Sequence, residues 1–136
     1  LAIHKIPEGL AVGVSFGTGN PGDVLTVAGA ISIQNIPEAF VIAAPLFAIG
    51  VKSSRILVIS LAIAAVSIAA VLSGYALVSA FVGAQAFLLA SAGGAMLYVI
   101  SDEMIPETHA HGFEKPATFA LIAGFLLVLT LQNALG

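Results

Sequence analysis

Long apolar segments, separated by short polar turns, dominate the hydrophobic pattern of this chain. Residues 56–101 contain no acidic, basic or histidine side chain, and residues 116–136 form a second uncharged run. The first run is long enough for two bilayer crossings of about 20 residues each. Neither run alternates with a period of two, and a helix satisfies its own backbone polar groups inside a bilayer. The pattern therefore predicts membrane-spanning helices rather than strands.

Turn residues divide this pattern into five helices. A cluster of glycine, asparagine and proline at 17–22 marks one turn, Pro106 marks a helix end, and Pro116 marks a helix start. The expected fold class is all-α: a polytopic membrane helix bundle, with residues 1–136 as a single transmembrane domain. Its five transmembrane helices are expected at about residues 1–17, 24–49, 55–81, 86–105 and 116–135.

The composition excludes the ordinary soluble classes. The chain is 60% hydrophobic and 8% charged, whereas soluble domains carry about 25% charged residues. It has no cysteine, which excludes disulfides and thiolate metal sites. We expect a multi-pass protein of the cell (inner) membrane, with the lipid bilayer as its surroundings and no nucleic-acid partner.

The charges of the loops predict the orientation in the membrane. The loops after the second and fourth expected helices carry Lys52, Arg55 and Lys115, whereas the turn after the first helix carries only Asp23. All lysines and arginines of the loops thus fall on one side, which the positive-inside rule makes cytoplasmic.

Two polar cassettes interrupt the apolar pattern: HKIPEGL, which begins at His4, and QNIPEAF, which begins at Gln34. In an antiparallel hairpin whose turn is centred near residue 21, His4 lies level with Glu38, and Glu8 lies level with Gln34. Within each helix the polar residues are four positions apart and share a face. At a rise of ~1.5 Å per residue, both cassettes lie roughly 15–20 Å from the outer turn, near the bilayer midplane.

A proline in each cassette is expected to kink its helix. Pro7 and Pro37 have no backbone N–H to donate, so each frees a carbonyl of the preceding turn. Broken backbone at membrane depth is tolerated where it lines a cavity, and transporters bind ions at such places.

Charged groups at this depth need partners, because each costs about 2.5–3.5 kcal/mol on insertion scales. An imidazole, a carboxamide oxygen and two carboxylates suit Zn²⁺ or another first-row divalent ion. We therefore predict a metal site between the two kinked helices, with four ligands: His4, Glu8, Gln34 and Glu38. The alternative is that Lys5 pairs with Glu8 or Glu38 and that the polar set only holds the helices together.

The cassettes resemble those of the ZIP (Zrt/Irt-like) family of divalent metal transporters. HKIPEGLAVGVSFG is similar to the fourth transmembrane helix of that family, and SIQNIPEAFVIAAPL is similar to the fifth, in the form of the GufA-like prokaryotic branch. The resemblance covers the whole chain and implies a fragment with family helices four to eight; the chain opens on LAIHK, without an initiator methionine. The missing N-terminal helices of the same chain are then expected partners, and a homodimer is a further candidate.

The resemblance implies transport of a divalent metal cation into the cytoplasm, with zinc as the first candidate and cadmium, iron and manganese as others. The metal would be the transported substrate, and no cofactor is expected. The family's metal ligands carry over to this chain as His4, Glu8, Gln34 and Glu38.

At Lys5 this chain departs from the pattern of family members that bind two metals. Family members that bind two metals have asparagine at that position and asparagine or aspartate at the position of Asn35. The third expected helix, 55–81, contributes no carboxylate. We therefore expect Lys5 and Asn35 to occupy the place of a second metal site, with the ammonium group balancing the glutamates.

The loop SDEMIPETHAHGFEK holds weaker candidates for loose zinc binding at a cytoplasmic exit: Glu107, His109 and His111. The alternative for these residues is an acidic loop that is simply solvated.

Other functions fit these residues less well than metal transport. A proton- or sodium-coupled transporter would use the same glutamates as carriers. An intramembrane metalloprotease usually carries a His-Glu-x-x-His helix, which this sequence lacks, so we expect no enzyme. A purely structural subunit is disfavoured by the four polar groups at the midplane.

Overall fold

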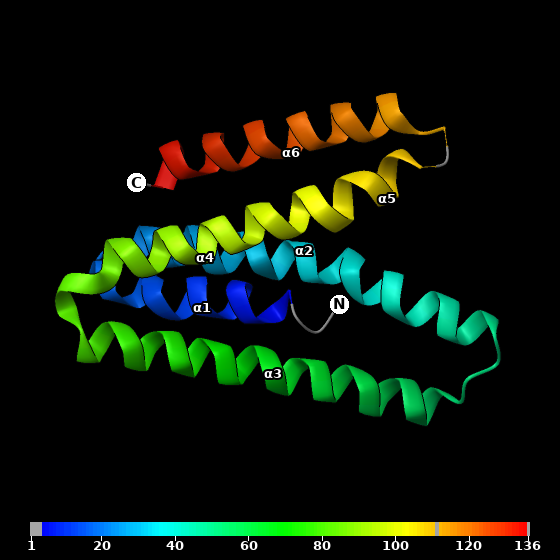
Figure 1. Cartoon of the computed structure of the whole chain (residues 1–136), viewed down its shortest axis with the longest axis horizontal. Coiled ribbons are helices and arrows are strands. Elements are labelled where there is room, and N and C mark those ends of the chain that lie inside the picture. Colours follow the sequence, from blue (N-terminus) through cyan, green and yellow to red (C-terminus); the bar gives the residue numbers. More distant parts are fainter. Residues whose placement is uncertain (1–3, 111, 136) are drawn as a thin grey trace.

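The computed structural model describes residues 4–110 and 112–135, which form five helical segments joined by short connections (Figure 1). No strand occurs in this part of the chain, so the all-α class is confirmed. The elements are α1 (Lys5–Ser15) with the 3₁₀ turn η1 (Phe16–Thr18), α2 (Pro21–Ala48), α3 (Ser53–Ala80), the 3₁₀ turn η2 (Val82–Ala84), α4 (Gln85–Val99) continued by the π-helical turn η3 (Ile100–Met104) and α5 (Ile105–His109), and α6 (Glu114–Leu135).

Four of these segments are long and apolar enough to cross a membrane: α2, α3, the rod Gln85–His109 and α6. The described part of α1 has 11 residues and starts directly after His4, the first described residue. The prediction of a polytopic helical bundle is confirmed, with α1 packed against the longer helices α2, α3 and α4.

The distribution of side chains is the inverse of that in a soluble protein. Phe40 and Phe87 on the outside are 70% and 73% exposed, whereas Lys5 and Glu8 are 5% and 8% exposed. Large apolar side chains on the outside suit lipid, and ionisable groups within membrane helices normally face the bundle interior. The bundle therefore encloses Lys5 and Glu8 and presents large apolar side chains on its surface.

A seam of small residues brings α1 and α3 into backbone contact. A Cβ atom added to Gly9 would lie 2.6 Å from Ala70 Cβ, and one added to Gly74 would lie 2.6 Å from the Leu10 carbonyl oxygen. At Gly13 an added Cβ would overlap the carbonyl oxygen of residue 71. Small residues at such intervals are typical of closely packed membrane helices, and here they set the position of α1 along α3.

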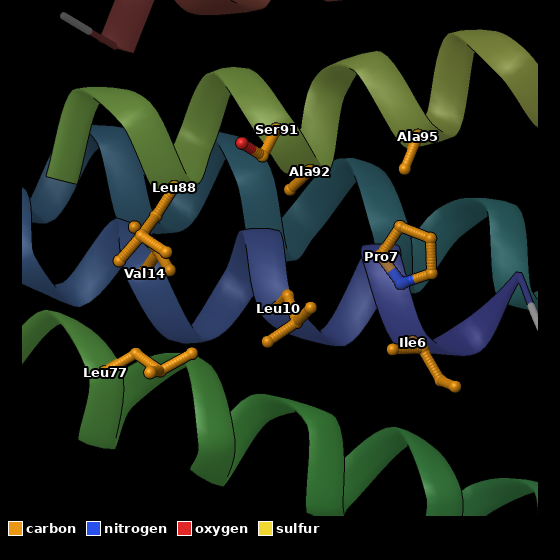
Figure 2. A pocket seen from close by; sticks show the side chains of 9 residues that line it. All are labelled: Ile6, Pro7, Leu10, Val14, Leu77, Leu88, Ser91, Ala92 and Ala95. Atoms are coloured by element: carbon orange, nitrogen blue, oxygen red, sulfur yellow. The ribbon is translucent and has the colours of Figure 1, made fainter. Parts of the chain in front are cut away.

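Another face of α1 meets α4 across an apolar crevice of about 220 Å³ (Figure 2). The crevice is lined by Ile6, Pro7, Leu10 and Val14 of α1, Leu77 of α3, and Leu88, Ser91, Ala92 and Ala95 of α4. Because α3 and α4 cover two faces of α1, its polar face is left to α2.

Both cassette prolines lie within helical segments. Pro37 lies inside α2. Pro7 is the third residue of the described part of α1. Ile3, whose carbonyl Pro7 was expected to free, lies outside the described residues.

The fourth helix continues beyond the expected end at residue 105. In η3 the N–H of Ile105 donates to the carbonyl of Ile100, which is the wide spacing of a π-turn. Pro106 then falls in the first turn of α5, where its missing N–H costs little. The wide turn thus lets the rod pass the proline and reach His109.

Gly13→Ala tests the seam between α1 and α3. The added methyl group would overlap the carbonyl oxygen of residue 71, so the helices must separate. We expect a loss of about 1–3 kcal/mol in the free energy of unfolding, as for other overpacked sites, measured as a lower thermal midpoint in detergent. Gly29→Ala in α2 is the control, because a Cβ atom there meets nothing within 4 Å. Equal midpoints for the two variants would contradict the close seam.

Candidate metal site

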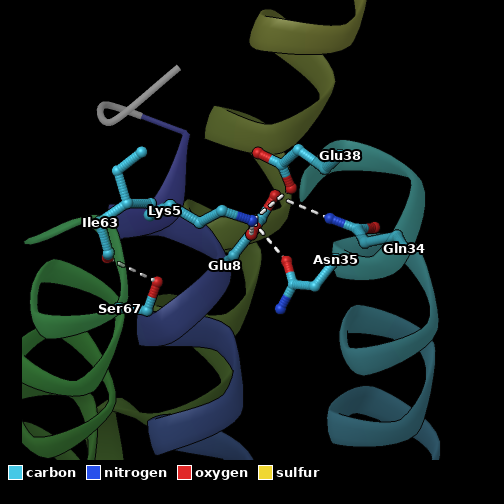
Figure 3. A network of polar contacts seen from close by, with 7 residues as sticks. All are labelled: Lys5, Glu8, Gln34, Asn35, Glu38, Ile63 and Ser67. Carbon is cyan, nitrogen blue, oxygen red and sulfur yellow. Dashed lines mark hydrogen bonds and ion pairs between the residues drawn. The ribbon is translucent and has the colours of Figure 1, made fainter. Parts of the chain in front are cut away.

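The two cassettes meet between α1 and α2 and form one polar cluster (Figure 3). Lys5 Nζ lies at its centre and donates to Glu8 Oε2 at 2.8 Å. The same ammonium group also donates to Asn35 Oδ1 and Glu38 Oε2. Gln34 Nε2 donates to Glu8 Oε1 at 2.7 Å, which joins the fifth side chain to the cluster.

Helical spacing explains why these side chains converge. Lys5 and Glu8 are three residues apart on α1, and Gln34 and Glu38 are four apart on α2, so each pair shares a helix face. The side chains of Lys5, Glu8 and Glu38 are only 6%, 10% and 19% exposed. Burying such charges separately would be costly, and mutual pairing with additional hydrogen bonds offsets that cost.

The α3 side of the cluster contributes no charged group. Ser67 Oγ donates to its own helix, to the Ile63 carbonyl oxygen at 3.3 Å (Figure 3). Both residues lie near the middle of α3 (Ser53–Ala80). The cluster is therefore level with the middle of the longest helices.

One of the two expected cross-helix pairs is formed and the other is not. Glu8 and Gln34 are hydrogen-bonded, as the hairpin register predicts. His4 does not reach Glu38: its Nε2 atom contacts Glu103 Oε2 of η3 at 2.5 Å. Lys5 takes the place beside Glu38, because its long side chain carries the ammonium group to both carboxylates at once.

The carboxylates are thus held by a lysine, which is the alternative arrangement weighed for this sequence. Within residues 4–110 and 112–135, no three histidine, aspartate or glutamate side chains are grouped so that they could hold one metal ion. For a dication to bind between Glu8 and Glu38, the ammonium group of Lys5 must make room and the ring of His4 must turn towards them.

Glu103 is the residue of this region that the sequence reasoning missed. It belongs to a rod that would otherwise be treated as one regular helix, and only the wide turn η3 brings it to His4. In the sequence, Pro106 is the residue that points to this irregular turn, because a proline that does not end a helix requires an irregular turn before it.

The loop candidates do not join the cluster. His109 Nδ1 lies 2.8 Å from the Ile105 carbonyl oxygen, and its Nε2 lies 3.1 Å from Thr118 Oγ1 of α6. These contacts connect α5 to α6. Glu107 is exposed on α5, and His111 lies outside the described residues.

Known proteins resemble this chain along its whole length. Zinc transporter GufA from Myxococcus xanthus is 47% identical over 136 residues, which cover all of this chain and 54% of GufA. Zinc transporter ZIPB from Bordetella bronchiseptica is 40% identical over all of this chain and 44% of its own length. Zinc transporter ZIP11 from Homo sapiens is 36% identical over all of this chain and 42% of its own length. The chain therefore spans about half the length of these relatives.

The match to a protein family covers nearly the same residues as the similarity to these relatives. Residues 1–132 match the ZIP zinc transporter family. The similarity to GufA is carried through both cassette helices and every helix after them, since it leaves no part of the chain uncovered. A match of this extent shows that the chain belongs to the ZIP zinc transporter family, in its GufA-like branch.

Proposed function

We propose that the protein transports a divalent metal cation, zinc in the first place, into the cytoplasm through the site between α1 and α2. The observation that carries this proposal is the pair of carboxylates that meet between α1 and α2: Glu8 is buried, and the side chain of Glu38 is 19% exposed. Two carboxylates, an amide oxygen and a nearby imidazole form a donor set for first-row dications. The relatives GufA and ZIPB are named as zinc transporters, which supports zinc as the substrate.

The depth of the cluster supports a midplane site. Ser67 and Ile63 mark the level of the cluster on α3, and they lie near the centre of its 28 residues. If α3 crosses the bilayer symmetrically, Glu8 and Lys5 are far from both surfaces. A carboxylate pair at that depth can receive an ion only from a polar path, as in a carrier or channel.

The arrangement of the connections supports one orientation of the bundle in the membrane. The α2–α3 and α5–α6 connections lie at one end of the bundle, while η1, η2 and the C-terminal end of α6 lie at the other (Figure 1). The first end includes the basic residues of the loops, Lys52, Arg55 and Lys115. The positive-inside rule assigns that end to the cytoplasm.

Charge counting gives Lys5 a role in the metal stoichiometry. Lys5, Glu8 and Glu38 together carry a formal charge of minus one. One dication changes this to plus one, and a second would raise it to plus three in a buried place. Such accumulation is unfavourable in a low-dielectric interior, so we assign one metal ion to this site, with Lys5 in place of the second.

Metal uptake by the full-length protein tests the transport function. We expect Glu8→Ala and His4→Ala to reduce the initial rate of radioactive zinc uptake into proteoliposomes at least ~10-fold, since each removes a proposed ligand. Glu114→Ala, at an exposed residue outside the cluster, is the control. Competition by Cd²⁺, Fe²⁺ and Mn²⁺ ranks the substrates. Uptake that is indifferent to both site variants would contradict the proposal, and zinc-independent proton or sodium flux lost in Glu8→Ala would favour the coupled transporter instead.

Lys5→Asn tests the replacement of a second metal by the ammonium group. The variant removes a positive charge and adds an amide oxygen, so we expect the bound zinc per protein to rise from one to two. Elemental analysis of the purified full-length protein measures this ratio, and calorimetry measures the affinity. Lys52→Asn, in the exposed α2–α3 connection, controls for the loss of a lysine. If Lys5→Asn changes neither the ratio nor the affinity, the assignment is wrong.

A further inference from the structure

We propose that Glu103 is a positioning residue that holds His4 away from the two carboxylates until a metal ion arrives. This inference rests on the proposed function, because it requires His4 to be a ligand of the transported ion. It adds a residue from the α4 rod to a site whose other members come from α1 and α2.

The contact between the two side chains carries the argument. His4 Nε2 lies 2.5 Å from Glu103 Oε2. A carboxylate at this distance needs a hydrogen on the nitrogen, and a ring nitrogen that carries hydrogen has no lone pair for a metal. While this contact lasts, Nε2 of His4 is closed to a metal ion, and the ring is held at Glu103 rather than between Glu8 and Glu38. Ligation together with the two carboxylates therefore competes with the contact to Glu103.

The position of His4 agrees with such competition. Glu8 and Glu38 share the ammonium group of Lys5, and no described cluster combines them with the imidazole of His4. His4 is nevertheless only one turn from Glu8 on the same helix. A change of side-chain rotamer is therefore the movement that we propose for His4, from Glu103 towards the carboxylates.

The wide turn η3 places Glu103 at this point. One additional residue in a turn rotates the following side chains by about 100° relative to the preceding helix. Such turns inside helices occur frequently at functional sites. Here η3 directs Glu103 to the first residues of α1, whereas a regular helix through residues 100–104 would present it elsewhere on the rod.

The exposure of the pair makes the contact reversible. The Glu103 side chain is 56% exposed and that of His4 is 13% exposed. A polar contact with one half-exposed partner is weak, and solvent can receive the carboxylate of Glu103 when His4 leaves. The contact therefore biases the orientation of His4 but yields to a metal ion that binds more strongly.

Zinc binding to Glu103→Gln tests the inference. In the full-length protein purified in detergent, we expect the zinc Kd to fall by about 3- to 10-fold, because more of the protein has His4 free to bind. Competition with a fluorescent zinc chelator measures this Kd. Asp102→Asn is the matched control: it removes an equal charge from the same turn, and we expect an unchanged Kd.

A second pair of variants assigns the effect to His4. His4→Ala should weaken zinc binding, and adding Glu103→Gln to His4→Ala should then change nothing. In proteoliposomes, Glu103→Gln should lower both KM and the maximal uptake rate, since the metal is held more tightly and leaves more slowly. Glu103→Asp keeps the charge on a shorter side chain and should give a smaller decrease in the zinc Kd. It replaces Glu103→Gln in this test if the glutamine variant does not fold.

Three results would overturn the inference. Weaker zinc binding in Glu103→Gln would make Glu103 a metal ligand or a residue that orients His4 for binding. An equal gain in the His4→Ala background, or in Asp102→Asn, would make the effect one of general charge. A failure of the proposed function would look different: His4→Ala itself would then leave zinc binding unchanged.

Discussion

A buried ammonium group between two carboxylates is the interaction on which this bundle depends. In a lipid environment, apolar side chains gain little by moving from lipid to a helix interface, so polar contacts and close packing must hold helices together. Between α1 and α2 the polar contacts are those of Lys5 with Glu8, Asn35 and Glu38. Breaking such a set would leave a charge without a partner in a low-dielectric interior, which is far more costly than separating apolar surfaces.

The close seam between α1 and α3 completes this arrangement. Because Gly9, Gly13 and Gly74 bring the two backbones together, no lipid or polar group can enter from that side. The polar face of α1 is thereby directed to α2, so Lys5 and Glu8 are buried, while the side chain of Glu38 on α2 stays 19% exposed. Packing by small residues and pairing by charged residues therefore support one another. The packing keeps lipid and polar groups away from the α1–α3 side, and the pairing offsets the free energy cost of burying the charged groups.

Much of this arrangement can be predicted from the sequence, because the two cassettes repeat the same spacing on both sides of one turn. The hairpin register predicts the contact of Glu8 with Gln34, and the uncharged runs predict the long helices. The partner of His4 could not be predicted, since it depends on the rotation of a distant rod at η3. The sequence predicts Lys5 beside the glutamates in two ways, as the partner that replaces a metal ion and as the substitute for a second one, because spacing alone does not decide whether a carboxylate pair holds a metal ion or a lysine.

The length of α2 and α3 has a consequence for the lipid environment. These 28-residue helices extend to about 42 Å, which exceeds a hydrocarbon core of about 30 Å, so a change in bilayer thickness acts on their tilt and their ends. The polar cluster lies at the level of the middle of both helices, where α1 and α3 are in backbone contact. Hydrophobic mismatch is therefore absorbed far from Lys5 and Glu8, and the same arrangement of polar groups can persist in membranes of different acyl-chain length.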